Sequence, residues 1–581
     1  MPVSPAPSCP EPRQPSLTPR RWGLLLTAGW LFQAGLRAWL GRGLDVPLAN
    51  PDESAYLIAA RVLAGGPGAN FTHSTLYPAG YPLLISPVFW FTQNPLTAYH
   101  AVLLVNALFS ALLMPLCYVA CRRLGLTSRP LAYGVATVTA LLPAGFFYSE
   151  FAMSDAIFPV LVLAWLLTTH SWLTAPTHRG RYLAAVGSAL LTGYSYAVHS
   201  RGLVLIAGYL GVLLIMLFWK KCRDSAILAS AVLLVTLLTA WALNQRLRAV
   251  MYPEGPRSFS SEAAYRLGSL HGIILVLEMA IGQLWRFTLD SWGVAALGMA
   301  AVVVAIARSR TPADARIIAG LAIALTLAIA ITTPAALPTD QPQAWASGRY
   351  LDCMIVTFFL PGMVVLLRAG RRRLLIYAAC VAPPTVIAAL VVDAYAGSSL
   401  PTHVFGAAFN FGEPAVLTQN WTQANVALAT AVGLGLLAVS VAVAALLPRA
   451  RVFVLLAGLT AVSVTADAQL TERIGNANEQ QAHATSVTPV ADLKQGEKIG
   501  ISNKLGWELW IPQMYELRWD GGVRFHPATQ APPAGVGAVE VPWQAGQSEQ
   551  ASWPTAPPGW HITAANQTAG WVLWQAPSPA S

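Results

Sequence analysis

The chain reads WGLLLTAGWLFQAGLRAWL at residues 22–40 and, after a short link, NPDESAYLIAARVLAGG at residues 50–66. The first stretch is apolar and close to the ~20 residues that a helix needs to cross a lipid bilayer. The second opens with two adjacent carboxylates, Asp52 and Glu53, and continues with apolar and small residues. The sequence therefore predicts a membrane helix followed by a short helix that begins near the membrane surface.

The composition places the whole chain among membrane proteins. Of its 581 residues, 55% are hydrophobic and only 11% are charged, whereas a soluble domain carries roughly a quarter charged residues. The mean hydropathy is +0.52. Because lipid cannot satisfy free backbone donors and acceptors, the part inside the membrane must be helical. The formal charge of +10 does not indicate nucleic-acid binding, because the basic residues lie in short loops between apolar segments.

About 13 apolar segments have the length and character of transmembrane helices. They lie at residues 22–40, 98–120, 130–147, 155–174, 182–198, 203–219, 225–244, 286–307, 316–333, 351–368, 374–394, 425–447 and 452–467. Arginine and lysine pairs or triplets alternate with these segments, so that they all fall on one side. By the positive-inside rule this side, with the N-terminus, is cytoplasmic. The sequence predicts a multi-pass protein of the plasma membrane.

Three regions follow from this pattern. Residues 1–19 are rich in Pro and Ser and are expected to form a disordered cytoplasmic tail. Residues 20–467 form the transmembrane domain, whose longer polar loops at 41–97, 245–285, 334–350 and 396–424 face outward. Residues 468–581 contain no further apolar span and show strand-like alternation, which predicts a small α/β domain on the external face. The fold class is a polytopic α-helical membrane protein with this C-terminal domain.

Helix capping explains the presence of one residue of the acidic pair, Glu53, but not of the other, Asp52. Asn50 is a good N-cap, Pro51 suits the first turn, and Glu53 stands three residues after the cap, as in a capping box. A structural role therefore accounts for Glu53 but leaves Asp52 without a task. Tyr56 lies on the apolar side of this helix, which we expect to lie along the membrane surface.

Three further motifs share the predicted external side with the acidic pair. They are TLYPAGYPLLISPVFWF at residues 75–91, YSEFAMSDAIFPVLVL at residues 148–163, and SGRYLD at residues 347–352. Together with the acidic pair they resemble the GT-C glycosyltransferases that use polyprenyl-phosphate sugars. That group includes the protein O-mannosyltransferases and the lipid A aminoarabinose transferases. The resemblance covers the topology of most of the membrane part.

The resemblance implies an inverting glycosyltransferase of the GT-C type. It would move a sugar from a polyprenyl-phosphate donor to a hydroxyl of a cell-envelope acceptor on the external face. Asp52 would be the general base that takes the acceptor's proton, and Glu53 would cap its helix or orient the neighbouring loop. The supporting or acceptor-binding candidates are Glu53, Tyr56, Tyr81, Glu150, Asp155 and Tyr350.

A departing phosphate develops negative charge and requires fixed cations. Arg201, at the outer end of a span, is the first candidate and Arg349 the second. An arginine at bilayer depth costs roughly 2.5–3.5 kcal/mol, so it needs a partner or a water-filled cavity. The alternatives are snorkelling of Arg201 to the headgroups and simple solvation of Arg349. The remaining phosphate-binding candidates are His199, for which an ordinary interfacial position is the alternative, Arg266 and His271.

Glu150 and Asp155 lie on one predicted external turn. They could contact the acceptor, or bind a divalent cation together with Asp52. The alternative for Asp155 is N-capping of the span that follows. A divalent cation is the one cofactor that these carboxylates suggest.

The main alternative function is a lipid-linked-sugar flippase or transporter. Such proteins place charged residues near the bilayer midplane or on paired broken helices, whereas the acids here gather at one face. A scaffold that presents the tryptophan-rich tail would leave the acidic pair unused. The sequence contains no Walker loop, HExxH motif or credible GxSxG elbow. It does not specify the sugar, the oligomeric state, or whether the acceptor is a glycan, a lipid or a protein.

Overall fold

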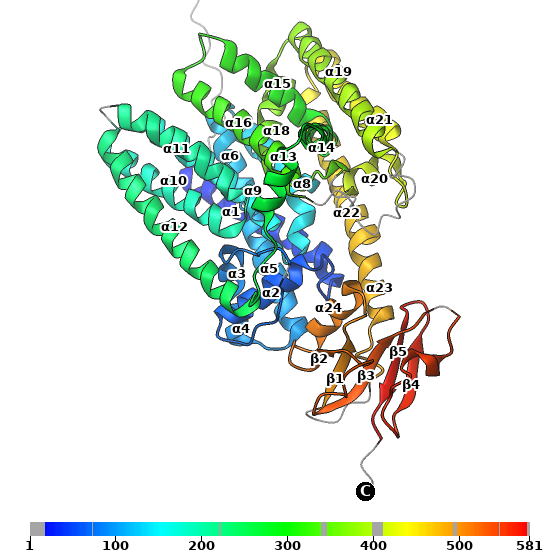
Figure 1. Ribbon diagram of the computed structural model, residues 1–581. Coiled ribbons are helices and arrows are strands. Elements are labelled where there is room, and N and C mark those ends of the chain that lie inside the picture. The colour runs from blue at the N-terminus through cyan, green and yellow to red at the C-terminus, as the bar shows by residue number, and fades with distance from the viewer. Residues whose placement is uncertain are drawn as a thin grey trace, which may run out of the picture.

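The computed structural model describes residues 18–72, 74–219, 222–337, 345–397, 411–491, 497–544 and 546–577. These residues form a bundle of helices with a small five-stranded sheet domain at one end (Figure 1). The predicted tail at residues 1–19 lies almost entirely outside the described ranges. The expectation of a helical membrane protein with a C-terminal α/β domain is confirmed, while the side of the membrane on which that domain lies stays a prediction.

The first half of the bundle contains long helices separated by short ones. Its elements are α1 (Pro19–Leu40), η1 (Gly41–Gly43), α2 (Asp52–Leu63), α3 (Gly80–Ile85), α4 (Val88–Phe91), α5 (Pro95–Ser110), α6 (Leu113–Arg123), α7 (Arg129–Ala140), α8 (Pro143–Phe146), η2 (Phe147–Glu150), η3 (Ser154–Ala156), α9 (Phe158–Thr174), α10 (His178–Val198), α11 (Gly202–Phe218) and α12 (Arg223–Met251).

The second half continues the bundle and leads into the sheet domain. Its helices are α13 (Phe259–Leu267), α14 (Leu270–Leu289), α15 (Val294–Ala307), α16 (Ala313–Ala336), α18 (Asp352–Arg368), α19 (Arg371–Ala396), α20 (Gly412–Thr418), α21 (Val426–Leu446), α22 (Arg451–Leu470), η5 (Thr471–Asn476) and α23 (Ala477–Thr485).

Within the described residues, 7 helices are long and apolar enough to cross a membrane. These are α5 with α6, α12, α14, α16, α19, α21, and α22 with α23. The segments Arg129–Ala140 and Pro143–Glu150 are bent by 75° and make an eighth span if they are counted together. Every predicted span falls largely on helical residues, but length and composition support fewer complete crossings than the predicted 13.

The predicted loop at residues 245–285 is wrong. The chain there continues α12 to Met251 and then forms α13 and α14. The predicted span at residues 286–307 is interrupted between Leu289 and Val294, where Gly293 has a left-handed φ of 77°. The sequence pattern did not predict α14 because polar side chains such as Gln283 and Arg286 lower its mean hydropathy. Its mean hydropathy of 1.4 is the lowest among the 7 long apolar helices.

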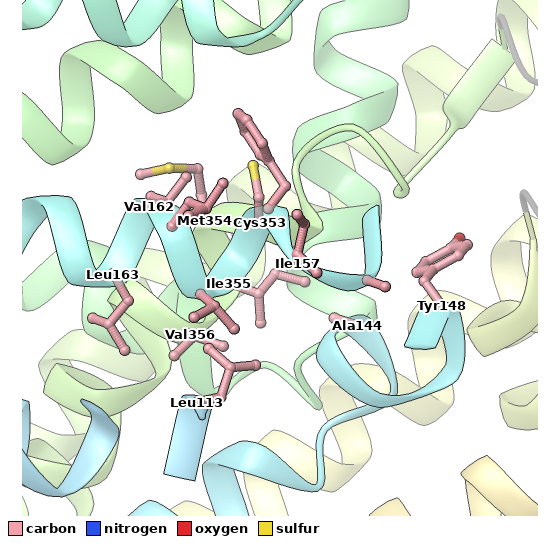
Figure 2. Packing of buried hydrophobic residues seen from close by; sticks show 14 of the residues in the cluster. Leu113, Ala144, Tyr148, Ile157, Val162, Leu163, Cys353, Met354, Ile355 and Val356 are labelled. Carbon is pink, nitrogen blue, oxygen red and sulfur yellow. The ribbon is translucent and has the colours of Figure 1, made fainter. Parts of the chain in front are cut away.

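A dense apolar core surrounds the start of α18 (Figure 2). Cys353, Met354, Ile355 and Val356 are buried there, and Val162 and Leu163 of α9 belong to the same cluster. Along its length α18 also packs closely against α15. This core fixes the beginning of α18, where the chain leaves the turn that contains Arg349.

The crossing of α15 and α18 depends on glycine at two positions. A Cβ on Gly298 would lie 1.8 Å from the carbonyl oxygen of Phe358, and one on Gly362 would lie 2.1 Å from that of Val294. Because both obstacles are backbone atoms, no side-chain rotation can make room for a methyl group.

We expect Gly298→Ala to destabilise the protein by about 1–3 kcal/mol, as overpacking does in a tight core. The matched control is Gly320→Ala in α16, where nothing lies within 4 Å of the added Cβ. That control should gain up to ~1 kcal/mol from helix propensity. Thermal unfolding of the two variants in detergent measures the difference. Equal midpoints would show that the helices do not cross at this glycine.

The C-terminal domain is a mixed sheet with the strand order β2-β1-β3-β5-β4. Its elements are β1 (Lys498–Ser502), α24 (Trp507–Glu516), β2 (Gly522–Phe525), β3 (Val536–Pro542), η6 (Glu549–Ser552), β4 (His561–Asn566) and β5 (Trp571–Gln575). β1 pairs in parallel with β2 and β3, and β5 pairs antiparallel with β3 and β4. The connection from β1 to β2 passes through α24, as parallel strands require.

A long helix leaves the bundle toward the sheet domain. The helical chain from Arg451 to Thr485 is continuous over 35 residues and joins α22 to α23. The boundary at residue 467 between the membrane domain and the external domain stays a prediction. Next to α24, the hydroxyl of Tyr515 donates to the carbonyl of Pro95 at 2.7 Å, and the guanidinium of Arg61 donates to the carbonyl of Arg518.

The α2 helix is enclosed and does not lie along a surface. All of its residues from Glu53 to Val62 are buried. It packs against α3 and α12 of the bundle and against α24 of the sheet domain. The expectation of an amphipathic surface helix is wrong, because the polar end of α2 faces other buried polar groups and its apolar side is covered by protein.

Candidate active site

Five separate parts of the chain meet at the beginning of α2. Asp52 is the first residue of α2, and Tyr77 precedes α3. Asp155 lies in η3, Arg201 precedes α11, and Arg349 lies in the turn before α18. Close packing of the backbone brings these parts together. A Cβ on Gly80, for example, would lie 2.5 Å from the carbonyl carbon of Ala197, so glycine lets α3 reach the end of α10.

Arg349 joins the two aspartates. Its Nη2 donates to Asp52 Oδ2 at 2.7 Å and to Asp155 Oδ2 at 2.9 Å. Its Nε donates to the same oxygen of Asp155 at 3.1 Å. The residues from YSEFAMSD and SGRYLD that the sequence grouped with Asp52 therefore contact one another directly.

Arg201 lies behind this pair and is fully engaged. Its Nη2 donates to Asp155 Oδ1 at 2.5 Å, and its Nη1 donates to the carbonyls of Arg349 and Tyr350 at 3.3 and 3.1 Å. Its guanidinium carbon also lies 4.8 Å from the ring centroid of Phe158. These contacts hold the turn at residues 349–350 and keep Arg201 in the interior without snorkelling to the surface.

The four charged side chains differ in solvent exposure, and this difference shows which of them a bound molecule can contact. The Asp52 side chain is 28% exposed and Arg349 16% exposed. Asp155 and Arg201 are each 4% exposed. Burial alone would raise the pKa of Asp155, but the charges of Arg349 and Arg201 outweigh it and hold that pKa below its usual range. Asp155 is therefore an ionised anchor, and Asp52 is the carboxylate that a bound molecule can reach.

His199 accepts hydrogen bonds at this site. Its Nδ1 accepts from the backbone N–H of Arg201 at 3.1 Å and from Arg201 Nε at 3.3 Å. Burial and the neighbouring charge of Arg201 lower the pKa of the imidazole well below its ordinary value. A neutral ring that accepts from arginine supports the position of Arg201.

Three tyrosines line the approach to Asp52. The hydroxyl of Tyr77 donates to Asp52 Oδ1 at 2.7 Å. The ring of Tyr56 lies edge-on to the rings of Tyr77 and Tyr81, each with a centroid distance of 5.1 Å. The hydroxyl of Tyr56 lies 2.8 Å from Ser154 Oγ, and the buried hydroxyl of Tyr81 donates to Asn106 at 3.0 Å. Sequence reasoning selected Tyr81 and missed Tyr77, although both belong to TLYPAGYP.

Glu53 has a structural position beside the site. Its carboxylate accepts the N–H groups of Leu48 and Ala49, each at 2.7 Å. It also accepts the hydroxyl of Tyr99 at 2.7 Å and the N–H of Ala152 at 2.6 Å. The predicted capping box is wrong, because α2 begins after Pro51. Glu53 does orient the neighbouring loop, since it ties the residues before α2 to those before η3.

Asn50, the predicted N-cap, plays a different part. Its side-chain oxygen accepts the hydroxyl of Ser54 at 2.6 Å, and its amide donates to the carbonyl of Pro47 at 2.7 Å. The side chain therefore shapes the turn before α2 and caps none of its backbone amides.

Glu150 belongs to a separate buried cluster. Both of its carboxylate oxygens accept from the hydroxyl of Thr471, at 3.0 and 2.8 Å. Arg37 of α1 lies in the same cluster and donates to Gln33 and Ser110. Within the described residues, η2 and η3 direct the carboxylates of Glu150 and Asp155 to different partners, and the supporting or acceptor-binding role of Glu150 stays a prediction.

Arg266 and His271 are also placed apart from the aspartates. The guanidinium of Arg266 in α13 donates to the carbonyl of Pro334. His271 is exposed near the start of α14. Within the described ranges, no hydrogen bond or ion pair joins either side chain to Asp52, Asp155 or Arg349, so their assignment to a phosphate stays a prediction.

Two groups of carboxylate or imidazole side chains have the spacing of metal ligands among the described residues. One is Asp45, Glu479 and His483, and the other is Asp290, Asp352 and Glu413. Neither group contains Asp52 or Asp155. The expectation that these two aspartates and Glu150 share a divalent cation therefore gains no support from the geometry.

Comparison with solved structures assigns the architecture. The structure resembles a crystal structure of ArnT from Cupriavidus metallidurans bound to undecaprenyl phosphate, with a TM-score of 0.56 and 16% sequence identity. The match covers 96% of this chain and 98% of that chain. The chain has the GT-C fold. The apo structure of the same ArnT matches with a TM-score of 0.52, 16% identity and the same coverage.

A weaker likeness extends to a larger GT-C protein. The arabinosyltransferase EmbB from Mycobacterium smegmatis matches with a TM-score of 0.38 and 13% identity, over 94% of this chain and 48% of that one. No protein-family model and no curated protein sequence matches the chain. The GT-C fold that the sequence motifs suggested is confirmed by structure, at an identity too low to transfer a substrate.

Proposed function

We propose that the chain is an inverting glycosyltransferase that moves a sugar from a polyprenyl-phosphate donor to a hydroxyl of a cell-envelope acceptor. The arrangement that supports this proposal is the contact of Asp52 with Arg349 at 2.7 Å, with Asp52 as the most exposed member of the cluster. A carboxylate and a guanidinium at one opening supply a proton acceptor and a phosphate-binding cation. The ArnT structure that matches this chain holds undecaprenyl phosphate, which is the product such a donor would leave.

The proposed step is a single displacement. The acceptor oxygen forms a bond to the anomeric carbon while the bond from that carbon to the phosphate oxygen breaks. The acceptor's proton passes to the carboxylate of Asp52, and polyprenyl monophosphate leaves with the electron pair of the broken bond. Attack opposite the leaving group inverts the anomeric configuration.

Arg349 is the residue that we assign to the leaving phosphate. It is the more exposed of the two arginines, and its partner Asp52 is more exposed than its partner Asp155. A phosphate that binds Arg349 would compete with Asp52 for the same donor. This competition would release Asp52 Oδ2 at the moment when the acceptor's proton must be taken.

Arg201 receives a positioning role in this proposal. Its donors are already engaged by Asp155, His199 and the carbonyls of the turn at residues 349–350. The phosphate therefore contacts Arg349, whose turn Arg201 holds in place. The sequence placed Arg201 first among the phosphate-binding candidates because it lies at the end of an apolar span. Tyr350 contributes its carbonyl to the same support.

The topology remains part of the proposal. The alternation of arginine-rich loops places the N-terminus in the cytoplasm and both the acidic site and the sheet domain outside. Nucleotide sugars are absent from that face, which accounts for a lipid-linked donor.

The alternative of a lipid-linked-sugar flippase is separated from the proposal by reconstitution. Purified protein in proteoliposomes is given a panel of undecaprenyl-phosphate sugars and a cell-envelope fraction as the acceptor. The expected result is a new glycoside of inverted configuration together with an equal amount of undecaprenyl phosphate. Movement of intact sugar-lipid between leaflets without glycoside formation would replace the transferase with a transporter.

A further inference from the structure

A second charged cluster lies outside the proposed reaction centre, where α14, α18 and α20 meet. Asp290 directly follows α14, Asp352 is the first residue of α18, and Glu413 lies in the first turn of α20. Each of the three carboxylates offers an oxygen within 4.8 Å of the oxygens of the other two. Their residues are 0%, 3% and 3% exposed, respectively. Three carboxylates are therefore gathered in the interior of the protein.

One cation balances part of this charge. Arg286 Nε donates to Asp290 Oδ1 at 2.9 Å, and its Nη2 donates to Glu413 Oε2 at 2.8 Å. Asp352 is not included, because neither of its carboxylate oxygens has a hydrogen-bond partner within the described residues. Asp290 Oδ2 is also buried without one in the same part of the chain. Three carboxylates and one guanidinium leave a formal charge of −2 if all are ionised.

Burying this uncompensated negative charge would cost free energy, which indicates that a ligand binds here. A buried carboxylate without a compensating partner costs several kcal/mol, and here one oxygen of each of the three carboxylates lies within 4.8 Å of the others. A divalent cation would remove the formal charge completely. Carboxylate oxygens are the ligands that hard cations such as Ca²⁺, Mg²⁺ and Mn²⁺ prefer, and the three residues offer no nitrogen or sulfur donor.

We propose that Asp290, Asp352 and Glu413 bind one divalent, oxygen-preferring cation. Asp352 is the principal ligand because both of its oxygens are available. Arg286 fixes Asp290 through Oδ1 and Glu413 through Oε2, and Asp290 Oδ2 has no hydrogen-bond partner within the described residues.

The position of this cluster connects it to the proposed reaction centre. A Cβ on Gly348 would lie 2.1 Å from Asp290 Oδ2 and 2.9 Å from Arg286 Nη2. The backbone just before Arg349 therefore packs directly on the cluster, and Asp352 is three residues beyond Arg349. A cation at this point would hold the turn that presents Arg349 to Asp52, without contacting substrate itself.

The test begins with metal binding, which does not depend on the proposed transferase activity. Purified full-length protein in detergent is treated with EDTA, dialysed, and then titrated with Ca²⁺, Mg²⁺ and Mn²⁺ while bound metal is measured by mass spectrometry. We expect one ion per chain and a higher midpoint of thermal unfolding in its presence, since a ligand that binds only the folded state stabilises it.

Substitutions of the proposed ligands test where the ion binds. Asp352→Asn should weaken binding by about 10–100-fold or more, since even indirect partners of a metal contribute that much. In EDTA the same variant should unfold at a higher temperature than the wild type, because it removes one uncompensated charge. Glu413→Gln is the second variant, should Asp352→Asn fail to fold. His483→Ala, in the other acidic group, is the matched control and should leave the stoichiometry and affinity of the most tightly bound ion unchanged.

Two results would overturn the proposal. One is a wild-type protein that binds none of the three cations and shows no change in its unfolding temperature, which would mean that protons neutralise the cluster. The other is binding that survives in both Asp352→Asn and Glu413→Gln but is lost in His483→Ala. A protein that binds the ion at this cluster yet transfers no sugar would reject the proposed function and leave the metal site intact.

Discussion

Asp52→Asn is expected to lower sugar transfer by roughly 10²–10⁴-fold, the usual contribution of a positioned general base. Asparagine has nearly the same shape as aspartate and can still accept from Tyr77, whose hydroxyl lies 2.7 Å from Asp52 Oδ1. It cannot take the acceptor's proton. The effect should therefore fall on the catalytic rate constant, measured with a polyprenyl-phosphate sugar in saturating amounts, while donor binding remains.

Asp45→Asn is the matched control for this substitution. Asp45 lies in the same stretch before α2 but is 40% exposed and pairs with His100 at 2.8 Å. Its replacement should leave transfer within about twofold of the wild type, as expected of an exposed ion pair that contributes little energy. Wild-type turnover by Asp52→Asn, with a folded protein, would remove Asp52 from the mechanism.

Arg349→Met is expected to lower both activity and stability. It removes the group that Asp52 and Asp155 share, so two carboxylates remain with only Arg201 beside Asp155. Breaking a buried ion pair costs about 3–5 kcal/mol, and the partial exposure of Arg349 and Asp52 places the expected loss at the lower end. Loss of one positively charged donor to the departing phosphate should reduce the rate by about 10²–10³-fold.

A double variant distinguishes electrostatics from loss of packing. Asp52→Asn combined with Arg349→Met removes the carboxylate that Arg349→Met leaves without a cation, since Asp155 keeps its pair with Arg201. The double variant should recover part of the lost stability without recovering activity. The control is Arg257→Met, which breaks the pair with Glu262 at 2.5 Å, where the side chains are 34% and 31% exposed. That pair should contribute less than ~1 kcal/mol. No recovery in the double variant would mean that Arg349 acts through packing alone.

Some of this site could be predicted from sequence because its residues carry local signals. Asp52 was selected because it stands first in an acidic pair at the start of a helix, where the resemblance to the GT-C glycosyltransferases implies the general base. Asp155 and Arg349 belong to short polar motifs at the ends of apolar segments. What the sequence could not give is their pairing, because Asp52 and Arg349 are 297 positions apart and only the packed bundle brings them together.

The errors have equally specific causes. Glu150 stands five positions before Asp155, yet the turn between η2 and η3 sends the two carboxylates to different neighbours. α14 was missed because its buried polar residues, Gln283 and Arg286, resemble a loop in composition. The cluster of Asp290, Asp352 and Glu413 was not predicted either, because Asp290 and Asp352 lay in two different predicted spans and Glu413 in a predicted loop, and nothing local links them.

The continuous helix from Arg451 to Thr485 restricts how the chain can bend where it leaves the bundle. Beyond it, Tyr515 donates to the carbonyl of Pro95 and Arg61 donates to that of Arg518, so α24 is held against the bundle at two further points. Under the proposed function, the side of α24 that faces α2 would therefore be presented to an acceptor in a constant orientation.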